Sequence, residues 1–246
     1  MIEIENLTKS YGSFQAVKHV DFNVQPGEIF GFLGVNGAGK TTTLKMLAGV
    51  LKPTTGSIKI CGHDMSSAPE KAKGVTGYIP DRPYIYNKLT GREFLYFVSD
   101  LYSVSDKDAD YRIDELLNEY GLLEWQDELV ESYSHGMKQR LATCAALVHK
   151  PKVLIVDEPM VGLDPHGAKF LKEAFRKYAD EGMSILLSTH TLSVAEEVAD
   201  RLAIIHKGSI ITMGTLEHIR QTAGHGGEIR LEEMFLRLTS SPIAAS

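Results

Sequence analysis

The sequence predicts an α/β fold in which a mostly parallel sheet is covered by helices on both faces. Short apolar runs that suit buried strands alternate with helical patterns, and this alternation is typical of parallel sheets with crossover helices. The runs are 29–33, 75–79, 153–156, 184–188 and 202–206. Between the second and third runs, helical patterns prevail without interruption. This predicts a helical subdomain inserted into the sheet.

The N-terminal part of the chain begins with strands. Residues 2–8 and 17–24 alternate apolar and polar side chains, which predicts two strands that pair antiparallel. We expect a turn over Lys9–Ser13 between them. Tyr11 lies in this turn, and an exposed aromatic ring there could stack on the base of a nucleotide.

A glycine-rich stretch follows the run 29–33 and precedes a helix predicted over 42–50. It fits the phosphate-loop pattern of one glycine, four residues and Gly-Lys-Thr, in the strand–turn–helix context that this pattern needs. Glycines let backbone N–H groups turn towards a phosphate, and the helix N-terminus adds positive potential. Lys40 would reach the β- and γ-phosphates, and the Thr41 hydroxyl suits Mg²⁺. The expected nucleotide contacts are Gly34, Asn36, Gly37, Ala38, Gly39, Lys40, Thr41 and Thr42.

These features predict a phosphate-loop NTPase core interrupted by a helical subdomain. Within a single domain of residues 1–246, the core is expected to comprise 1–88 and 151–222, the subdomain 89–150 and a helical tail 223–246. Three apolar stripes at helical spacing are predicted to form the core of the subdomain. They are Phe94, Phe97, Val98 and Leu101; Ile113, Leu116, Leu117 and Tyr120; and Met137, Leu141, Cys144 and Val148.

Charged and titratable side chains follow two of the predicted strands. Asp157 and Glu158 end one of them, at the carboxyl edge where open α/β sheets bind ligands. Asp157 would hold Mg²⁺, and Glu158 is placed to orient or deprotonate an attacking water. A buried carboxylate pair is costly unless a cation lies near, which favours a functional role. His190 follows the next strand, where it could contact the γ-phosphate. The predicted catalytic residues are Glu158, His190 and Lys40.

A further polar motif, Tyr133–Arg140, precedes a predicted helix. Ser134 is a good N-cap, and the neighbouring backbone N–H groups form an anion site. This motif belongs to the helical subdomain and lies far along the chain from the phosphate loop.

Taken together and in this order, the motifs make the chain resemble the ATP-binding subunit of ABC transporters along nearly its whole length. The matching elements are Tyr11 as the adenine-stacking aromatic, Gly34–Thr42 as Walker A, Ser134–Arg140 as the signature, Val153–Glu158 as Walker B, Gly162–Pro165 as the D-loop and His190 as the switch histidine. The resemblance implies an Mg²⁺-dependent ATPase that forms an ATP-dependent, head-to-tail homodimer. Each ATP would lie between one subunit's Walker A and the other's signature, where Ser134 and Gly136 would contact it.

Two departures from the family pattern concern the site. His135 stands where the signature usually has glycine. Asp81 stands at the position of the Q-loop glutamine, so an oxygen ligand for Mg²⁺ remains while the amide donor is lost. An acidic residue here, like the tail 231–239, resembles the subset of ABC ATPases that serve multidrug or polysaccharide exporters. The resemblance implies a cytoplasmic protein, peripheral on the inner face of the cell membrane, which powers export through a separate integral membrane permease.

The segment after Asp81 is the expected docking site for that permease. It joins the nucleotide edge to the helical subdomain, and its aromatics Tyr84 and Tyr86 are of a kind enriched in interface cores. The alternative is that these aromatics only fix the subdomain to the core.

Two other functions compete with this reading. A GTPase shares the phosphate loop, and Asp164–Gly167 matches its Asp-x-x-Gly element, but Asn87–Thr90 lacks the aspartate that reads guanine. A non-transport ABC-type ATPase would usually carry a coiled coil, a second ATPase domain or a basic patch, and none is visible in this sequence.

Composition limits the partners. The formal net charge is −6, which does not favour nucleic-acid binding. No apolar run approaches the roughly 20 residues that span a bilayer, and the acidic N-terminus is unlike a signal peptide. Cys61 and Cys144 show no metal-binding spacing and are expected to be core thiols in a reducing compartment.

Overall fold

The structure is a computed structural model, and it describes residues 1–222 and Phe235. The predicted tail helix lies outside the described residues apart from Phe235, whose side chain is 9% exposed. Phe235 belongs to a small cluster of buried side chains with Leu33, Ala195 and Ile219.

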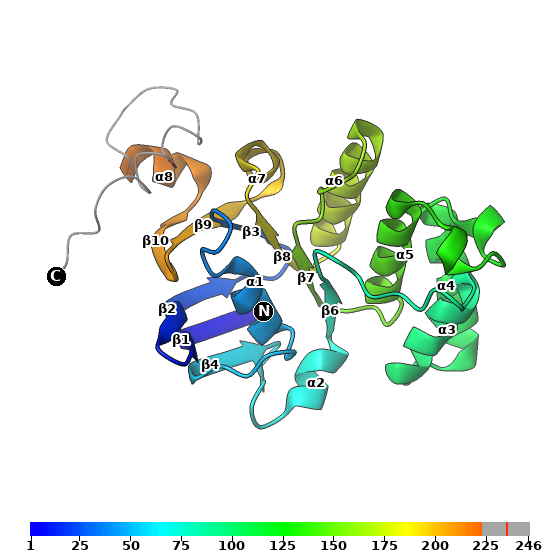
Figure 1. Cartoon of the computed structure of the whole chain (residues 1–246), viewed down its shortest axis with the longest axis horizontal. Helices are drawn as coiled ribbons and strands as arrows, with labels where there is room; N and C mark the ends of the chain where they lie inside the picture. Colours follow the sequence, from blue (N-terminus) through cyan, green and yellow to red (C-terminus); the bar gives the residue numbers. More distant parts are fainter. Residues whose placement is uncertain (223–234, 236–246) are drawn as a thin grey trace.

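A six-stranded sheet forms the centre of the molecule (Figure 1). Its strands, in spatial order, are β10 (Ser209–Gly214), β9 (Arg201–His206), β3 (Ile29–Leu33), β8 (Ser184–Thr189), β7 (Val153–Asp157) and β6 (Thr76–Ile79). All neighbouring pairs are parallel except β10 with β9. Every residue of β3, β7 and β8 is buried, as expected for parallel strands covered on both faces. The mostly parallel sheet predicted from the sequence is confirmed.

A second, antiparallel sheet contains the N-terminal strands. Its order is β2 (Phe14–Val24), β1 (Ile2–Tyr11), β4 (Thr55–Ile60) and β5 (His63–Asp64). The predicted turn over Lys9–Ser13 is too long, because Lys9 pairs with Val17 and Tyr11 pairs with Phe14. Tyr11 is therefore the last residue of a strand rather than a turn residue.

Eight α-helices lie among the described residues, and some of them cover each face of the six-stranded sheet. They are α1 (Lys40–Leu47), α2 (Pro69–Gly74), α3 (Gly91–Leu101), α4 (Asp106–Glu119), α5 (His135–Leu147), α6 (Pro165–Asp180), α7 (Leu192–Val198) and α8 (Leu216–Thr222). Leu44 and Leu47 of α1 pack in one cluster with the antiparallel sheet and with Val153 and Ile155 of β7. On the opposite face, Leu154 and other strand residues pack with α5 and α6. Helix α1 and helix α5 thus cover opposite faces of one sheet.

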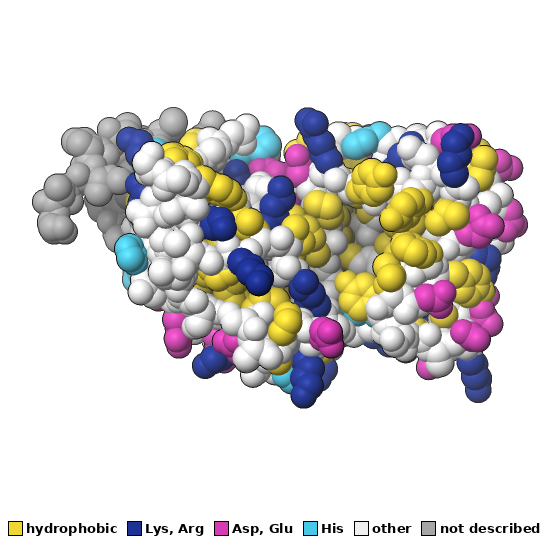
Figure 2. Space-filling view, turned by 60° about the horizontal axis from the view of Figure 1, so that its bottom comes forward, with side chains coloured by type: hydrophobic (Ala, Val, Ile, Leu, Met, Phe, Trp, Pro, Cys, Tyr) yellow, Lys and Arg dark blue, Asp and Glu magenta, His cyan; other side chains and the backbone are white. Residues whose placement is uncertain are grey.

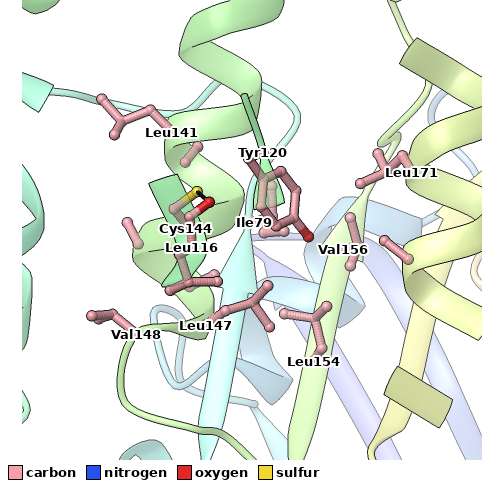
Figure 3. Packing of buried hydrophobic residues seen from close by; sticks show 14 of the residues in the cluster. Ile79, Leu116, Tyr120, Leu141, Cys144, Leu147, Val148, Leu154, Val156 and Leu171 are labelled. Carbon is pink, nitrogen blue, oxygen red and sulfur yellow. Dashed lines mark hydrogen bonds between the residues drawn. The ribbon is translucent and has the colours of Figure 1, made fainter. Parts of the chain in front are cut away.

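The helices α3, α4 and α5 gather at one end of the molecule (Figure 1). Their first turns are capped by side chains: Thr90 and Glu93 form a capping box on α3, and Ser105 caps α4. Figure 3 shows Leu116 of α4 and Cys144 of α5 close to Ile79 of β6, in the cluster that joins the helices to the sheet. Burial raises the pKa of the Cys144 thiol.

One predicted stripe is only partly in the core, which corrects the expectation from spacing. Phe94 is buried, but Phe97 is 38% exposed and Leu101 is 67% exposed. Tyr86 lies beside Phe97, with ring centroids 5.3 Å apart in an edge-on arrangement. The spacing correctly predicts a helix, but half of its apolar stripe faces away from the core together with the preceding loop.

Two α-helices, α2 and α8, and two strands, β5 and β10, were not predicted. The last forms a hairpin with β9 through Lys207 and Gly208, which both have positive φ, at 47° and 87°. Such a turn favours glycine and matches the twist of the two strands. The strand residues of β10 are only half buried, so β10 lacks the strong apolar signal of its neighbours.

His149 links the helical end of the molecule to the sheet and makes folding pH-dependent. Its ring stacks on Tyr102 at 3.7 Å between centroids, its Nε2 lies 3.2 Å from the carbonyl oxygen of Thr76, and burial lowers its pKa to about 4. The unfolded chain, with an ordinary histidine pKa of about 6.5, therefore takes up this proton first, and stability falls as the pH drops from 6.5 to 4. We expect His149 to account for a loss on the order of 2–3 kcal/mol at pH 4.

Denaturant unfolding of His149→Phe tests this expectation, since phenylalanine keeps the stack but cannot be protonated. The variant should lose less stability than the wild type between pH 6.5 and 4. His63→Phe, on β5, is the matched control. If the free energy of unfolding changed equally with pH in the wild type and in His149→Phe, groups other than His149 would be responsible for the pH dependence between pH 6.5 and 4.

Candidate functional site

The glycine-rich loop joins β3 to α1, as the sequence predicts. Gly39, the last loop residue, has φ 111°, and a Cβ atom there would lie 2.6 Å from the carbonyl oxygen of Ala16. Any side chain at this position would therefore push β2 away from the loop. Helix α1 begins at Lys40, so its unpaired first-turn N–H groups point back over the loop. This geometry suits an anion such as a phosphate.

Lys40, Glu158 and His190 meet at the carboxyl edge of the sheet. The Lys40 ammonium is 6% exposed, donates to the Gly34 carbonyl oxygen at 2.7 Å and lies 3.3 Å from Glu158 Oε1. The other oxygen of Glu158 lies 2.9 Å from His190 Nδ1. Strands β3, β7 and β8 are parallel neighbours, so the residues that follow them share one edge. The structure thus joins the three residues predicted to be catalytic through direct contacts.

Glu158 has an unusual backbone. Its φ is 51°, a left-handed conformation that costs a non-glycine residue energy and that clusters at functional sites. Its backbone N–H donates to the carbonyl oxygen of Ser188 at 3.1 Å, which ties it to the end of β8. This tie turns the carboxylate towards Lys40 and His190.

Asp157 is fully buried beside Glu158. The Ser188 hydroxyl donates to Asp157 Oδ1, while Oδ2 is buried and has no hydrogen-bond partner among the described residues. A buried carboxylate oxygen without a donor suits a cation. Sequence reasoning missed Ser188, although its place at the end of a buried strand was a usable signal.

The other predicted metal ligands are exposed. Thr41 lies in the first turn of α1, and Asp81 follows β6. Across the residues that the structure describes, no three His, Cys, Asp or Glu side chains form a group that could hold a metal. Mg²⁺ is usually held by only one or two carboxylates together with substrate phosphates and water, so Asp157 with Thr41 or Asp81 would be a suitable set of ligands.

Tyr11 and Ser134 lie apart from this centre. Tyr11 is 51% exposed at the end of β1, and the Lys9 ammonium lies 5.3 Å from its ring centroid. Ser134 is the N-cap of α5 and accepts from the Met137 N–H at 3.3 Å, as predicted. Gly136 lies in the same first turn. Helices α5 and α1 cover opposite faces of the sheet, and among the described residues no hydrogen bond or ion pair joins Ser134 to Lys40.

His135, the departure in the signature, packs against the loop before α6. A Cβ atom at Gly162 would lie 2.9 Å from His135 Nε2, so the imidazole ring fills the space over that glycine. Asp164 then caps α6 by accepting from the Gly167 N–H at 2.6 Å. The larger side chain is thus accommodated by a glycine on the neighbouring loop.

Comparison with known proteins agrees with this arrangement. A family model described as ABC transporter matches residues 17–161. The uncharacterized ABC transporter ATP-binding protein YxlF of Bacillus subtilis is 42% identical over 90% of this chain and 73% of its own length. The bacitracin transport ATP-binding protein BcrA of Bacillus licheniformis is 40% identical over 90% and 72%. A solved structure, titled "Structure of ATP binding subunit of ABC transporter", superposes with a TM-score of 0.91 at 34% identity, covering 97% of this chain and 99% of that one. The chain belongs to the family of ABC transporter ATP-binding proteins.

Proposed function

We propose that this protein binds ATP with Mg²⁺ and hydrolyses it to power export of a substrate through a separate membrane permease. The observation that carries the proposal is the contact of Lys40, Glu158 and His190 beside the glycine-rich loop. Family membership favours ATP over GTP and transport over the non-transport alternative. We further propose residues 1–88 and 151–222 as the nucleotide-binding core, with 89–150 as the helical subdomain.

In the proposed mechanism, Glu158 and the bound phosphate compete for the positive charge of Lys40. Lys40 is paired with Glu158, and a phosphate that reaches Lys40 would take over its charge. Glu158 would then be free to accept a proton from an attacking water, while His190 would contact the γ-phosphate. Bound Mg²⁺ neutralises phosphate charge. Its proposed ligands are Thr41, Asp157 and Asp81, and Tyr11 would stack on the base.

A γ-phosphate bound at Lys40 would also need donors on the side that faces away from the loop. Ser134 and Gly136 form an anion site at the first turn of α5, but α5 lies on the wrong face to serve Lys40 of the same chain. A second copy in head-to-tail orientation would supply this turn. We therefore propose an ATP-dependent homodimer with two shared sites.

The proposed permease surface consists of Tyr84, Tyr86, Phe97 and Leu101, which are 84%, 47%, 38% and 67% exposed. Figure 2 shows hydrophobic side chains gathered on the helical half of the molecule, away from the grey atoms. An exposed apolar patch of this kind marks an interaction site. No helix among the described residues is long and apolar enough to cross a membrane. The permease would hold this protein on the cytoplasmic face, and the acidic residue at Asp81 favours export by resemblance to exporter ATPases.

We expect Tyr84→Ala combined with Tyr86→Ala to release the protein from membranes. The two rings pack in a T-shaped arrangement with centroids 5.7 Å apart, so the double exchange removes both tyrosine rings from the surface. Co-sedimentation with membranes that contain the permease should fall about tenfold or more, while ATPase activity of the isolated protein stays near wild type.

Tyr111→Ala is the control, because Tyr111 is 67% exposed on α4 and outside this surface. If the double variant still co-sediments like the wild type and retains its ATPase activity, the docking surface lies elsewhere.

A further inference from the structure

Tyr78 carries a buried hydroxyl that the proposed chemistry does not yet use. It lies on β6, and its Oη is buried without a hydrogen-bond partner among the described residues. A buried polar group without a partner is rare, because its lost hydrogen bonds to water are not replaced. The residues around Tyr78 therefore indicate what the hydroxyl could bind.

The register of the sheet places Tyr78 near Asp157, the carboxylate proposed to bind the metal. Tyr78 pairs with Ile155 of β7, and both pack in the cluster on the α1 face of the sheet. Alternation along β7 puts Asp157 on the same face, two residues further on. Burial and the nearby charges of Asp157 and Asp81 all raise the pKa of Tyr78, so the phenol stays a hydrogen-bond donor.

A hydrogen-bond donor and a hydrogen-bond acceptor, both without a partner, thus lie on the same face of the sheet. Tyr78 offers a proton, and Asp157 Oδ2 accepts one but has no partner. They do not bond to each other, which leaves both available to a group between them. β6 is held firmly there, since a Cβ at Gly77 would lie only 2.4 Å from the carbonyl oxygen of Ala146.

We propose that the Tyr78 hydroxyl holds a water of the Mg²⁺ hydration shell together with Asp157, which makes Tyr78 a positioning residue for the metal–nucleotide complex. The inference rests on the proposed function and deepens it. Partners in the outer shell of a metal site typically change metal affinity by about 10–100-fold when they are removed.

Tyr78→Phe in the full chain tests the proposal, with Mn²⁺ as the metal probe and a non-hydrolysable fluorescent ATP analogue as the nucleotide. The readout is the ratio of nucleotide affinity at saturating Mn²⁺ to that in chelator, which measures the coupling between metal and nucleotide. We expect the ratio to fall about tenfold in the variant. Affinity in chelator should stay within about twofold of wild type. A ratio equal to that of the wild type would overturn the proposal.

Two further measurements separate the possible outcomes. Without metal, Tyr78→Phe should melt at or above the wild-type temperature, since the exchange removes an unsatisfied buried group. A marked drop in melting temperature would mean that the hydroxyl already has a hydrogen-bond partner within the fold, and would contradict the inference. Tyr102→Phe, which removes a tyrosine hydroxyl at the end of α3, should leave the ratio unchanged. If wild-type protein bound no nucleotide at all, the proposed function itself would fail, which is a distinct result.

Discussion

Glu158→Gln is expected to slow ATP hydrolysis by about 10²–10⁴-fold, the usual contribution of a general base. Glutamine keeps the size of the side chain but cannot accept a proton from water. It also leaves the Lys40 ammonium, now 3.3 Å from Glu158 Oε1, without its counter-charge. A phosphate would then meet less competition for Lys40, so ATP should bind and persist. The two measurements are phosphate release and nucleotide binding. We expect phosphate release to fall while nucleotide binding is retained.

Lys40→Ala should behave differently, because it removes the charge that attracts the phosphates. Nucleotide binding itself should weaken in that variant. Glu131→Gln, an exposed carboxylate that pairs with Lys88, is the control for the loss of a charge and should be neutral. Wild-type hydrolysis by Glu158→Gln would falsify the assignment of Glu158 as the base.

Ser134→Arg is expected to abolish the ATP-dependent dimer. In the Glu158→Gln background, ATP should shift the protein from monomer to dimer on gel filtration, because two intact nucleotides then bridge the subunits. Arginine at Ser134 would crowd the partner's γ-phosphate and remove the side chain that caps α5. The double variant should elute as a monomer with or without ATP, a change from mostly dimer to essentially none.

Ser105→Arg provides a matched control for this experiment. Ser105 is an exposed N-cap in the same group of helices, on α4, so the exchange adds the same charge and loses a cap worth about 1 kcal/mol. It should dimerise normally. A monomer under every condition, including the unmodified Glu158→Gln protein with ATP, would contradict the shared-site arrangement.

Local patterns in the sequence predicted the parts of this protein that depend on neighbours along the chain. Apolar runs gave the parallel strands because a buried strand needs a continuous apolar stretch. The phosphate loop was visible because its glycines and Lys40 have a set spacing. Ser134 was identified as an N-cap because capping involves only the first turn of a helix, and the structure agrees.

The tertiary structure alone decided which residues meet across the chain. The pairing of Lys40 with Glu158 and the bond from Ser188 to Asp157 each join elements that are far apart in sequence. The burial of the unpaired Tyr78 hydroxyl likewise depends on the packing around β6. The exposure of Phe97 and Leu101 could not be predicted from the sequence either, because residue spacing defines an apolar stripe but does not show which elements cover it. These features depend on strand order, on register and on which face of the sheet each helix covers, and they arise only when long-range packing is complete.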